Sequence, residues 1–168
     1  MDRLSLLSAL ESDATNLFAQ DQLRRIDAIL VEKAPIGGVI AQILSLTPKY
    51  DYVNPNITDS NFPVTTEPNL DGARLDKITG SRTQILAALK RDGRRAATAA
   101  ELLLYGIKNP EEQRKYWIWA LAQVWLAPGS RYECAVVLLV RGGGKRRADL
   151  SDVADDVDAV ERVLSFPL

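Results

Sequence analysis

Two stretches near the C-terminal end of this chain carry residue types that could support chemistry. The first, residues 136–145, is an apolar run followed by three glycines and Lys145. A strand, a glycine turn and a lysine ahead of a helix would suit a phosphate group. The phosphate-loop pattern, however, requires a glycine where this chain has Leu139, and a serine or threonine where it has Arg146. We therefore interpret Gly142–Lys145 as a connection and expect no nucleotide cofactor.

The second stretch is acidic, and carboxylate oxygens are ligands for hard divalent cations. Its acidic members are Asp149, Asp152, Asp155, Asp156, Asp158 and Glu161. They lack the spacing and the glycine of a calcium loop. Apolar residues recur among them at intervals of three and four, at Leu150, Val153, Val157, Val160 and Leu164. This pattern predicts a closing amphipathic helix over Leu150–Leu164, capped by Asp149 or Ser151, and no metal site.

Lys145, Arg146 and Arg147 allow an alternative interpretation, in which Gly142–Arg147 is the wing of a winged-helix DNA-binding regulator. Helices beginning near residues 81, 98 and 109 would precede it. A recognition helix presents polar and basic side chains to DNA, whereas Lys115 is followed by the apolar text YWIWALA. A third strand after the wing is also missing if Ala148 begins the acidic helix. Nucleic-acid contact through these three cations remains the alternative.

The sequence contains no histidine, and this excludes several classes of enzyme. Histidine is the usual general base near neutral pH and the commonest metal ligand. Its absence removes Ser-His-Asp and Cys-His nucleophile systems and HExxH zinc sites. The single cysteine, Cys134, lies in an apolar run, which favours a buried and unreactive thiol. We therefore predict a protein that is not an enzyme, with no catalytic residues and no cofactor.

The composition is that of a globular protein, with 46% hydrophobic and 26% charged residues. A length of 168 residues predicts a single domain over residues 1–168. The net charge of −1 supplies no global field for a polyanion. The first residues lack the apolar core of a signal peptide, and no apolar run reaches the length of a membrane span. We expect a cytoplasmic protein without membrane contact.

Residues 47–80 form a long arm rich in proline and asparagine. Its aromatic residues indicate that it packs on something, either its own domain or a neighbouring subunit. Basic and acidic residues are also segregated along the chain. A pair of solvated faces is the commoner explanation of such segregation, and it also suits packing between subunits. The candidate interface residues are Tyr50, Tyr52, Phe62, Arg91, Arg94, Arg95, Asp155 and Asp156.

The elements that would position these residues follow from hydrophobic spacing and capping signals. Residues 2–34 have helical periodicity, and the short apolar run Val39–Leu46 favours a strand, with a buried helical turn as the alternative. Ser81 is a helix cap. Helix and strand stay open for residues 81–104, although the alanine content favours helix.

Asn109, Pro110 and two glutamates predict the start of a helix. The tryptophans Trp117, Trp119 and Trp125 share a period-two face with Leu121. We therefore interpret residues 116–126 and 132–140 as the two strands of a hairpin that turns at Pro128-Gly129. One long buried helix over residues 110–126 is the alternative.

Together these elements predict an α/β (α+β) fold with N-terminal helices, a small antiparallel sheet, the hairpin Trp117–Val140 and the closing helix in the text RRADLSDVADDVDAVERVL. This order resembles phage tail-terminator and tail-completion proteins of the head–tail neck, chiefly over residues 115–164. The resemblance implies a structural subunit of a homo-oligomeric ring that binds neighbouring structural proteins. It also implies the virion as the final location, without cofactor or catalysis.

Overall fold

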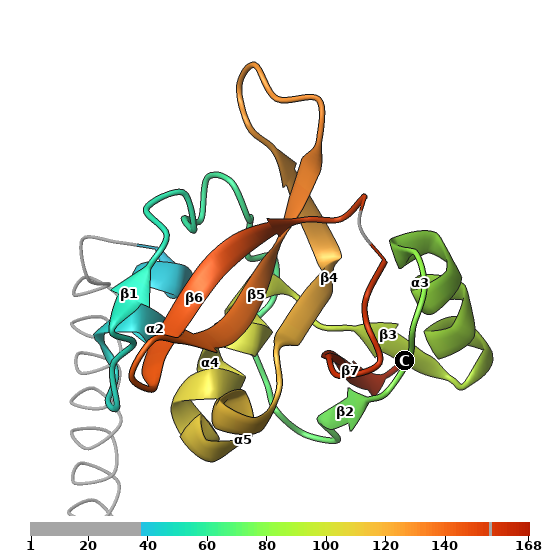
Figure 1. The fold of residues 1–168 in the computed structure, drawn as a ribbon, viewed down its shortest axis with the longest axis horizontal. Helices are drawn as coiled ribbons and strands as arrows, with labels where there is room; N and C mark the ends of the chain where they lie inside the picture. Colours follow the sequence, from blue (N-terminus) through green and yellow to red (C-terminus); the bar gives the residue numbers. More distant parts are fainter. Residues whose placement is uncertain (1–37, 155) are drawn as a thin grey trace, which may run out of the picture. The chain divides into compact units, whose positions relative to one another are not determined.

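Helices and a seven-stranded mixed sheet make up the structure, which confirms the α+β class (Figure 1). This computed structural model describes residues 38–154 and 156–168, and these belong to a compact unit spanning residues 37–168. The helices expected over residues 2–34 and the candidate residue Asp155 lie outside the described residues.

The sheet is larger than the small antiparallel sheet expected, and it is mixed. Its strands are β1 (Tyr52–Val53), β2 (Arg74–Asp76), β3 (Arg94–Ala96), β4 (Ile118–Leu126), β5 (Glu133–Arg141), β6 (Lys145–Asp152) and β7 (Arg162–Pro167). Strands β4, β5 and β6 form an antiparallel meander at the centre. Strand β7 runs parallel to β4, β1 runs parallel to β6, and both β2 and β3 pair antiparallel with β7.

Helices cover both faces of this sheet. They are α2 (Val39–Ser45), α3 (Arg82–Arg91), α4 (Ala99–Lys108) and α5 (Pro110–Lys115). Successive residues of a strand point to opposite faces. Ile118 of β4 accordingly lies in a buried cluster with α2 and α4, whereas Trp119 lies in a second cluster with α3. A sheet buried on both faces explains why β4 and β5 are apolar at nearly every position.

Capping boxes define the two longest described helices. Ser81 accepts a hydrogen bond from the Gln84 backbone N–H, and the Gln84 side chain accepts one from the Ser81 N–H. Thr98 and Glu101 make the same reciprocal pair at the start of α4. Each pair satisfies two backbone donors that a helix end leaves free. The expected cap at Ser81 is confirmed. Residues 81–104, for which helix and strand stayed open, form α3 and most of α4 with the short strand β3 between them.

The strand expected over Val39–Leu46 is wrong, because Val39–Ser45 is the helix α2. Ile40 and Ile43 are its buried residues, and their spacing of three places both on one helical face. A short apolar run fits a buried strand and a buried helical turn equally well, so periodicity alone does not separate them.

The closing amphipathic helix Leu150–Leu164 is also wrong. Residues up to Asp152 belong to β6, a connection follows, and β7 begins at Arg162. Leu150 pairs with Val136 of β5, and Leu164 pairs with Leu75 of β2. Sheet pairing therefore overrides the helical spacing, and Val160, one member of the expected apolar stripe, is exposed.

The predicted hairpin is confirmed as β4 and β5. The alternative, one long helix over residues 110–126, is wrong because α5 ends at Lys115. The shared tryptophan face is only partly right. Trp119 and Leu121 lie on the α3 side, but Trp125 packs on the opposite core. The pairing register with β5 shifts between Ala120 and Trp125, and such a bulge changes the face of every later residue.

Candidate functional site

A cavity beside α3 and β3 combines cationic and apolar side chains, and we call it the basic pocket. It has a volume of about 600 Å³. Its lining includes the cations Lys90, Arg94 and Arg95, the apolar residues Leu86, Ala96, Ala122 and Leu168, and the polar residues Thr66, Thr98 and Glu101. Two of these cations, Arg94 and Arg95, were candidate interface residues. Arg91, another candidate interface residue, is exposed beside Lys90 in the last turn of α3 but does not line the pocket.

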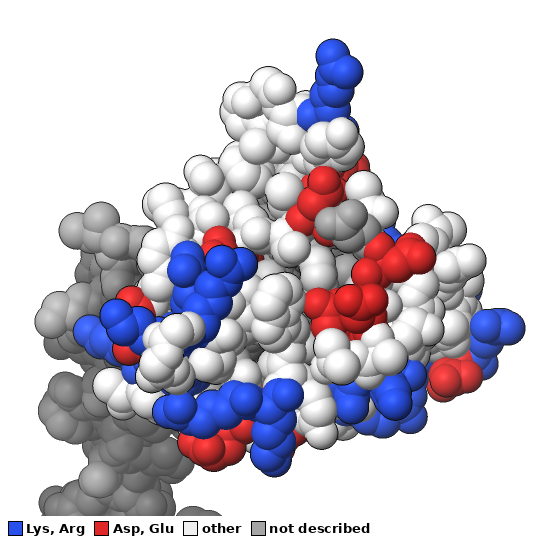
Figure 2. Space-filling model, viewed as in Figure 1, with Lys and Arg blue, Asp and Glu red and all other residues white. Residues whose placement is uncertain are grey.

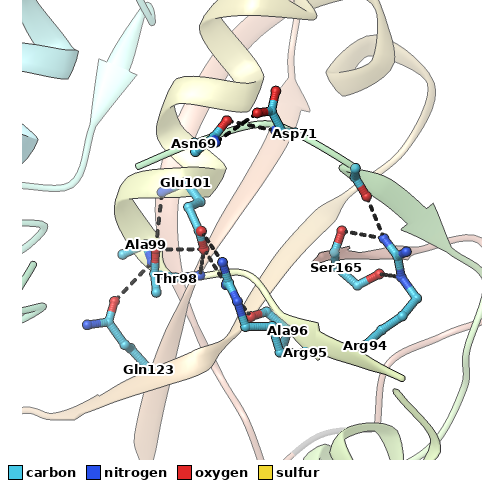
Figure 3. A network of polar contacts seen from close by, with 11 residues as sticks. Asn69, Asp71, Arg94, Arg95, Ala96, Thr98, Ala99, Glu101, Gln123 and Ser165 are labelled. Carbon is cyan, nitrogen blue, oxygen red and sulfur yellow. Dashed lines mark hydrogen bonds and ion pairs between the residues drawn. The ribbon is translucent and has the colours of Figure 1, made fainter. Parts of the chain in front are cut away.

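Arg95 and Glu101 form a two-pronged ion pair on one wall of the basic pocket (Figure 3). The guanidinium nitrogens of Arg95 lie 2.9 and 2.6 Å from the two carboxylate oxygens. Glu101 also accepts hydrogen bonds from the backbone N–H and hydroxyl of Thr98. Burial alone would raise the pKa of Glu101, but these donors outweigh burial and hold the pKa below its usual range. Glu101 is therefore a satisfied structural carboxylate.

Arg94 is fixed by the sheet on the neighbouring wall (Figure 3). Its Nε donates to the hydroxyl of Ser165 at 2.7 Å, and one terminal nitrogen donates to the carbonyls of Gly72 and Ser165. Ser165 in turn donates its hydroxyl to Asp76. Because Ser165 is fully buried, this Arg-Ser-Asp arrangement locks β2, β3 and β7 together and offers no accessible nucleophile.

The connection between β6 and β7 carries acidic side chains, and we call its residues 156–161 the acidic loop. Asp156, Asp158 and Val160 are exposed, while Val157 and Glu161 are buried. The candidate residue Asp156 is thus on the surface. Figure 2 shows acidic side chains gathered beside α3, while lysine and arginine side chains follow the lower rim of the view. Among the described residues no group of three or more potential ligands is placed to hold a metal ion.

The long arm, residues 47–80, packs on its own domain, which is one of the two arrangements that the sequence left open. Phe62 is 0% exposed in the core beneath α2 and α4. The Tyr50 hydroxyl donates to the carbonyl of Leu103, and burial raises the Tyr50 pKa although Arg146 opposes it. These two candidate interface residues are therefore committed to the fold. Tyr52, the third aromatic candidate, stays partly exposed and stacks under Arg147.

The three cations of the DNA-binding alternative do not form one exposed patch. Arg146 is only 4% exposed, lies over the Tyr50 ring, and donates to the carbonyl of Gly106 and the side chain of Gln113. Arg147 is paired with Asp149 at 2.9 Å. Lys145 alone is exposed. Their glycine turn is a connection, as expected, but it leads into strand β6, so the expectation that no strand follows it was wrong.

Cys134 lies at the start of β5 and is partly buried. Burial raises the pKa of its thiol, and the nearby charge of Asp152 acts in the same direction. A thiol with a raised pKa carries little thiolate at neutral pH. This agrees with the expectation of an unreactive thiol.

The tip of the β4–β5 hairpin, residues 126–132, extends beyond the rest of the sheet (Figure 1). Leu126 and Tyr132 flank its turn and are 55% and 58% exposed. The position of the turn follows from the sequence but this exposure does not, because both residues adjoin apolar segments that lead into the buried part of the sheet. The only signal was their position next to Pro128-Gly129, at the end of both strands.

No described helix has the length and apolar character needed to cross a membrane. Comparisons with protein-family models, with curated proteins and with solved structures find no match for this chain.

Proposed function

We propose that this chain is a non-enzymatic structural subunit that self-associates, and that it belongs to a phage tail or neck. The observation that carries the proposal is the hairpin tip with Leu126 and Tyr132 exposed. A two-stranded ribbon beyond its sheet has little stability of its own. Exposed apolar side chains on such an extension favour a contact with a partner, and tyrosine is enriched among the residues that dominate interfaces.

The charge distribution supports the same proposal. A net charge of −1 with separated acidic and basic surfaces suits subunits that meet through complementary patches. The resemblance to tail-terminator and tail-completion proteins supplies the biological setting, a ring at the tail or neck that is assembled in the cytoplasm. That resemblance rests on the hairpin and the arm, because residues 150–152 and 162–164 belong to strands.

The test is the oligomeric state of the full chain, measured by size-exclusion chromatography with light scattering and by native mass spectrometry. We expect a closed homo-oligomer. The double variant Leu126→Ser, Tyr132→Ser should weaken assembly by about 2 kcal/mol, which is about 30-fold in Kd, because it removes the apolar contact.

Leu46→Ser is the matched control, since Leu46 is another exposed leucine, 42% exposed, outside the hairpin. It should leave the oligomeric state unchanged, and circular dichroism should show that every variant keeps the fold. A wild-type chain that stays monomeric up to about 100 µM, where ordinary interfaces are occupied, would overturn the proposal.

A further inference from the structure

The acidic loop is held in place by contacts with the rest of the fold. The Val157 and Gly80 backbones exchange two hydrogen bonds, and Glu161 accepts one from the Asp158 N–H at 2.9 Å. These contacts hold the loop at two points and leave Asp156, Asp158 and Val160 facing outward. Val160 is 75% exposed, as much as any large apolar residue of the described chain. A loop that is already held in place loses little conformational entropy on binding.

The basic pocket has the complementary chemistry. Lys90 is exposed and supplies positive charge, whereas Arg94 and Arg95 are already held by Ser165 and Glu101. Leu86, Ala96 and Ala122 supply an apolar surface. Glu101 is the one acidic side chain in the lining, and Arg95 already neutralises it. A ligand with a carboxylate beside a small apolar group would suit this pocket, and Asp156, Asp158 and Val160 present that combination.

The loop of one chain is kept away from its own pocket. Val157 is bound to Gly80, just before the N-terminus of α3, whereas Lys90 lies in the last turn of that helix. The ten residues of α3 separate the two ends by about 15 Å. The loop is therefore anchored at the opposite end of α3 from Lys90, which favours a contact between copies over one within a chain.

We infer that the basic pocket receives the acidic loop of a second copy of this chain, with Val160 on the apolar surface and the aspartates beside Lys90. The inference rests on the proposed self-association and names the two surfaces that meet. Since the surfaces differ, the contact is head-to-tail, and repeating it produces a ring when the rotation closes and a filament when it does not. The hairpin tip then forms a separate contact of the same assembly.

A charge exchange between the two surfaces tests the inference, with Kd measured by sedimentation velocity on the full chain. Lys90→Glu and Asp158→Lys should each raise Kd about tenfold, because each places like charges together. The combined variant Lys90→Glu, Asp158→Lys should return Kd to within about threefold of the wild type. Val160→Ser should also weaken assembly, without the salt dependence of the charge variants.

Lys108→Glu is the matched control, since Lys108 is an exposed lysine in the last turn of α4 and does not line the pocket. It should leave Kd unchanged. A wild-type chain that assembles with a Kd insensitive to both single variants overturns the pocket inference and leaves the proposed function standing. Single variants that weaken assembly without recovery in the combined variant also overturn the pairing. A monomeric wild-type chain overturns the proposed function itself.

Discussion

Arg146 shows how one side chain can connect parts of the chain that are distant in sequence. It contacts Gln113 of α5, the Gly106 carbonyl of α4 and the Lys49 carbonyl of the arm, and it stacks on Tyr50. A planar guanidinium has enough donors to satisfy several acceptors at once. A buried cation whose donors are used in internal hydrogen bonds stabilises the fold and is not available to bind a polyanion.

Arg146→Ala should therefore lower the free energy of unfolding by about 3 kcal/mol, because it leaves buried acceptors without donors and opens a cavity. Urea unfolding followed by circular dichroism measures this change. Lys145→Ala, at the exposed neighbouring position, should stay within about 0.5 kcal/mol of the wild type. Equal effects of the two substitutions would contradict the structural role of Arg146.

At the scale of elements, the sequence predicted those features whose signals are local. Ser81 begins a helix with a side chain placed to cap it, and Pro128-Gly129 closes the hairpin. Residues 150–164 could not be assigned in this way. Leu164 lies in a strand because β2, β3 and β4 pair around it, and partners so distant in sequence leave no trace in local spacing.

The candidate site was predictable to a similar extent. The charge cluster at residues 90–95 indicated a basic surface, but it could not show that Arg94 and Arg95 are held by Ser165 and Glu101. For Arg146 a local signal existed. Alternation along a strand places residues 146 and 148 on the same face of the sheet, and both are buried. This pattern was not used because residues 150–164 were expected to form a helix that begins near Ala148.

The end of α3 depends on a glycine. Gly93 follows the helix with φ +68, a conformation that side chains disfavour, and an added Cβ there would meet nothing within 4 Å. Gly93→Ala should lower the free energy of unfolding by about 1 kcal/mol through backbone strain alone. Gly142→Ala is the matched control, since Gly142 has equal space but no such φ. The control should be neutral or slightly stabilising in the same urea titration.

At the scale of the whole molecule, the two buried clusters lie on opposite faces of one sheet and share its strands β4, β5 and β7. Loss of packing on one face therefore also destabilises the other. Val163 and Leu164 are adjacent in β7, yet they lie in different cores. Such a fold is expected to unfold cooperatively. Its stability can therefore be read from a single transition, including its response to pH.

Carboxylates should determine how the free energy of unfolding changes at acidic pH, because the sequence has no histidine to titrate near neutrality. The pKa of Glu101 is lower in the folded chain than its ordinary value of 4.5. In that range the unfolded chain binds more protons, so stability rises with pH. The stabilisation of the fold by the ionised Glu101 is complete above the unfolded-state pKa, and it is lost as the pH falls through the folded-state pKa.

Glu101→Gln should therefore lower the free energy of unfolding more at pH 7 than at pH 3, measured by urea unfolding. Gly93→Ala, a backbone effect, should lose the same amount at both pH values, and an equal loss for Glu101→Gln would contradict the assignment.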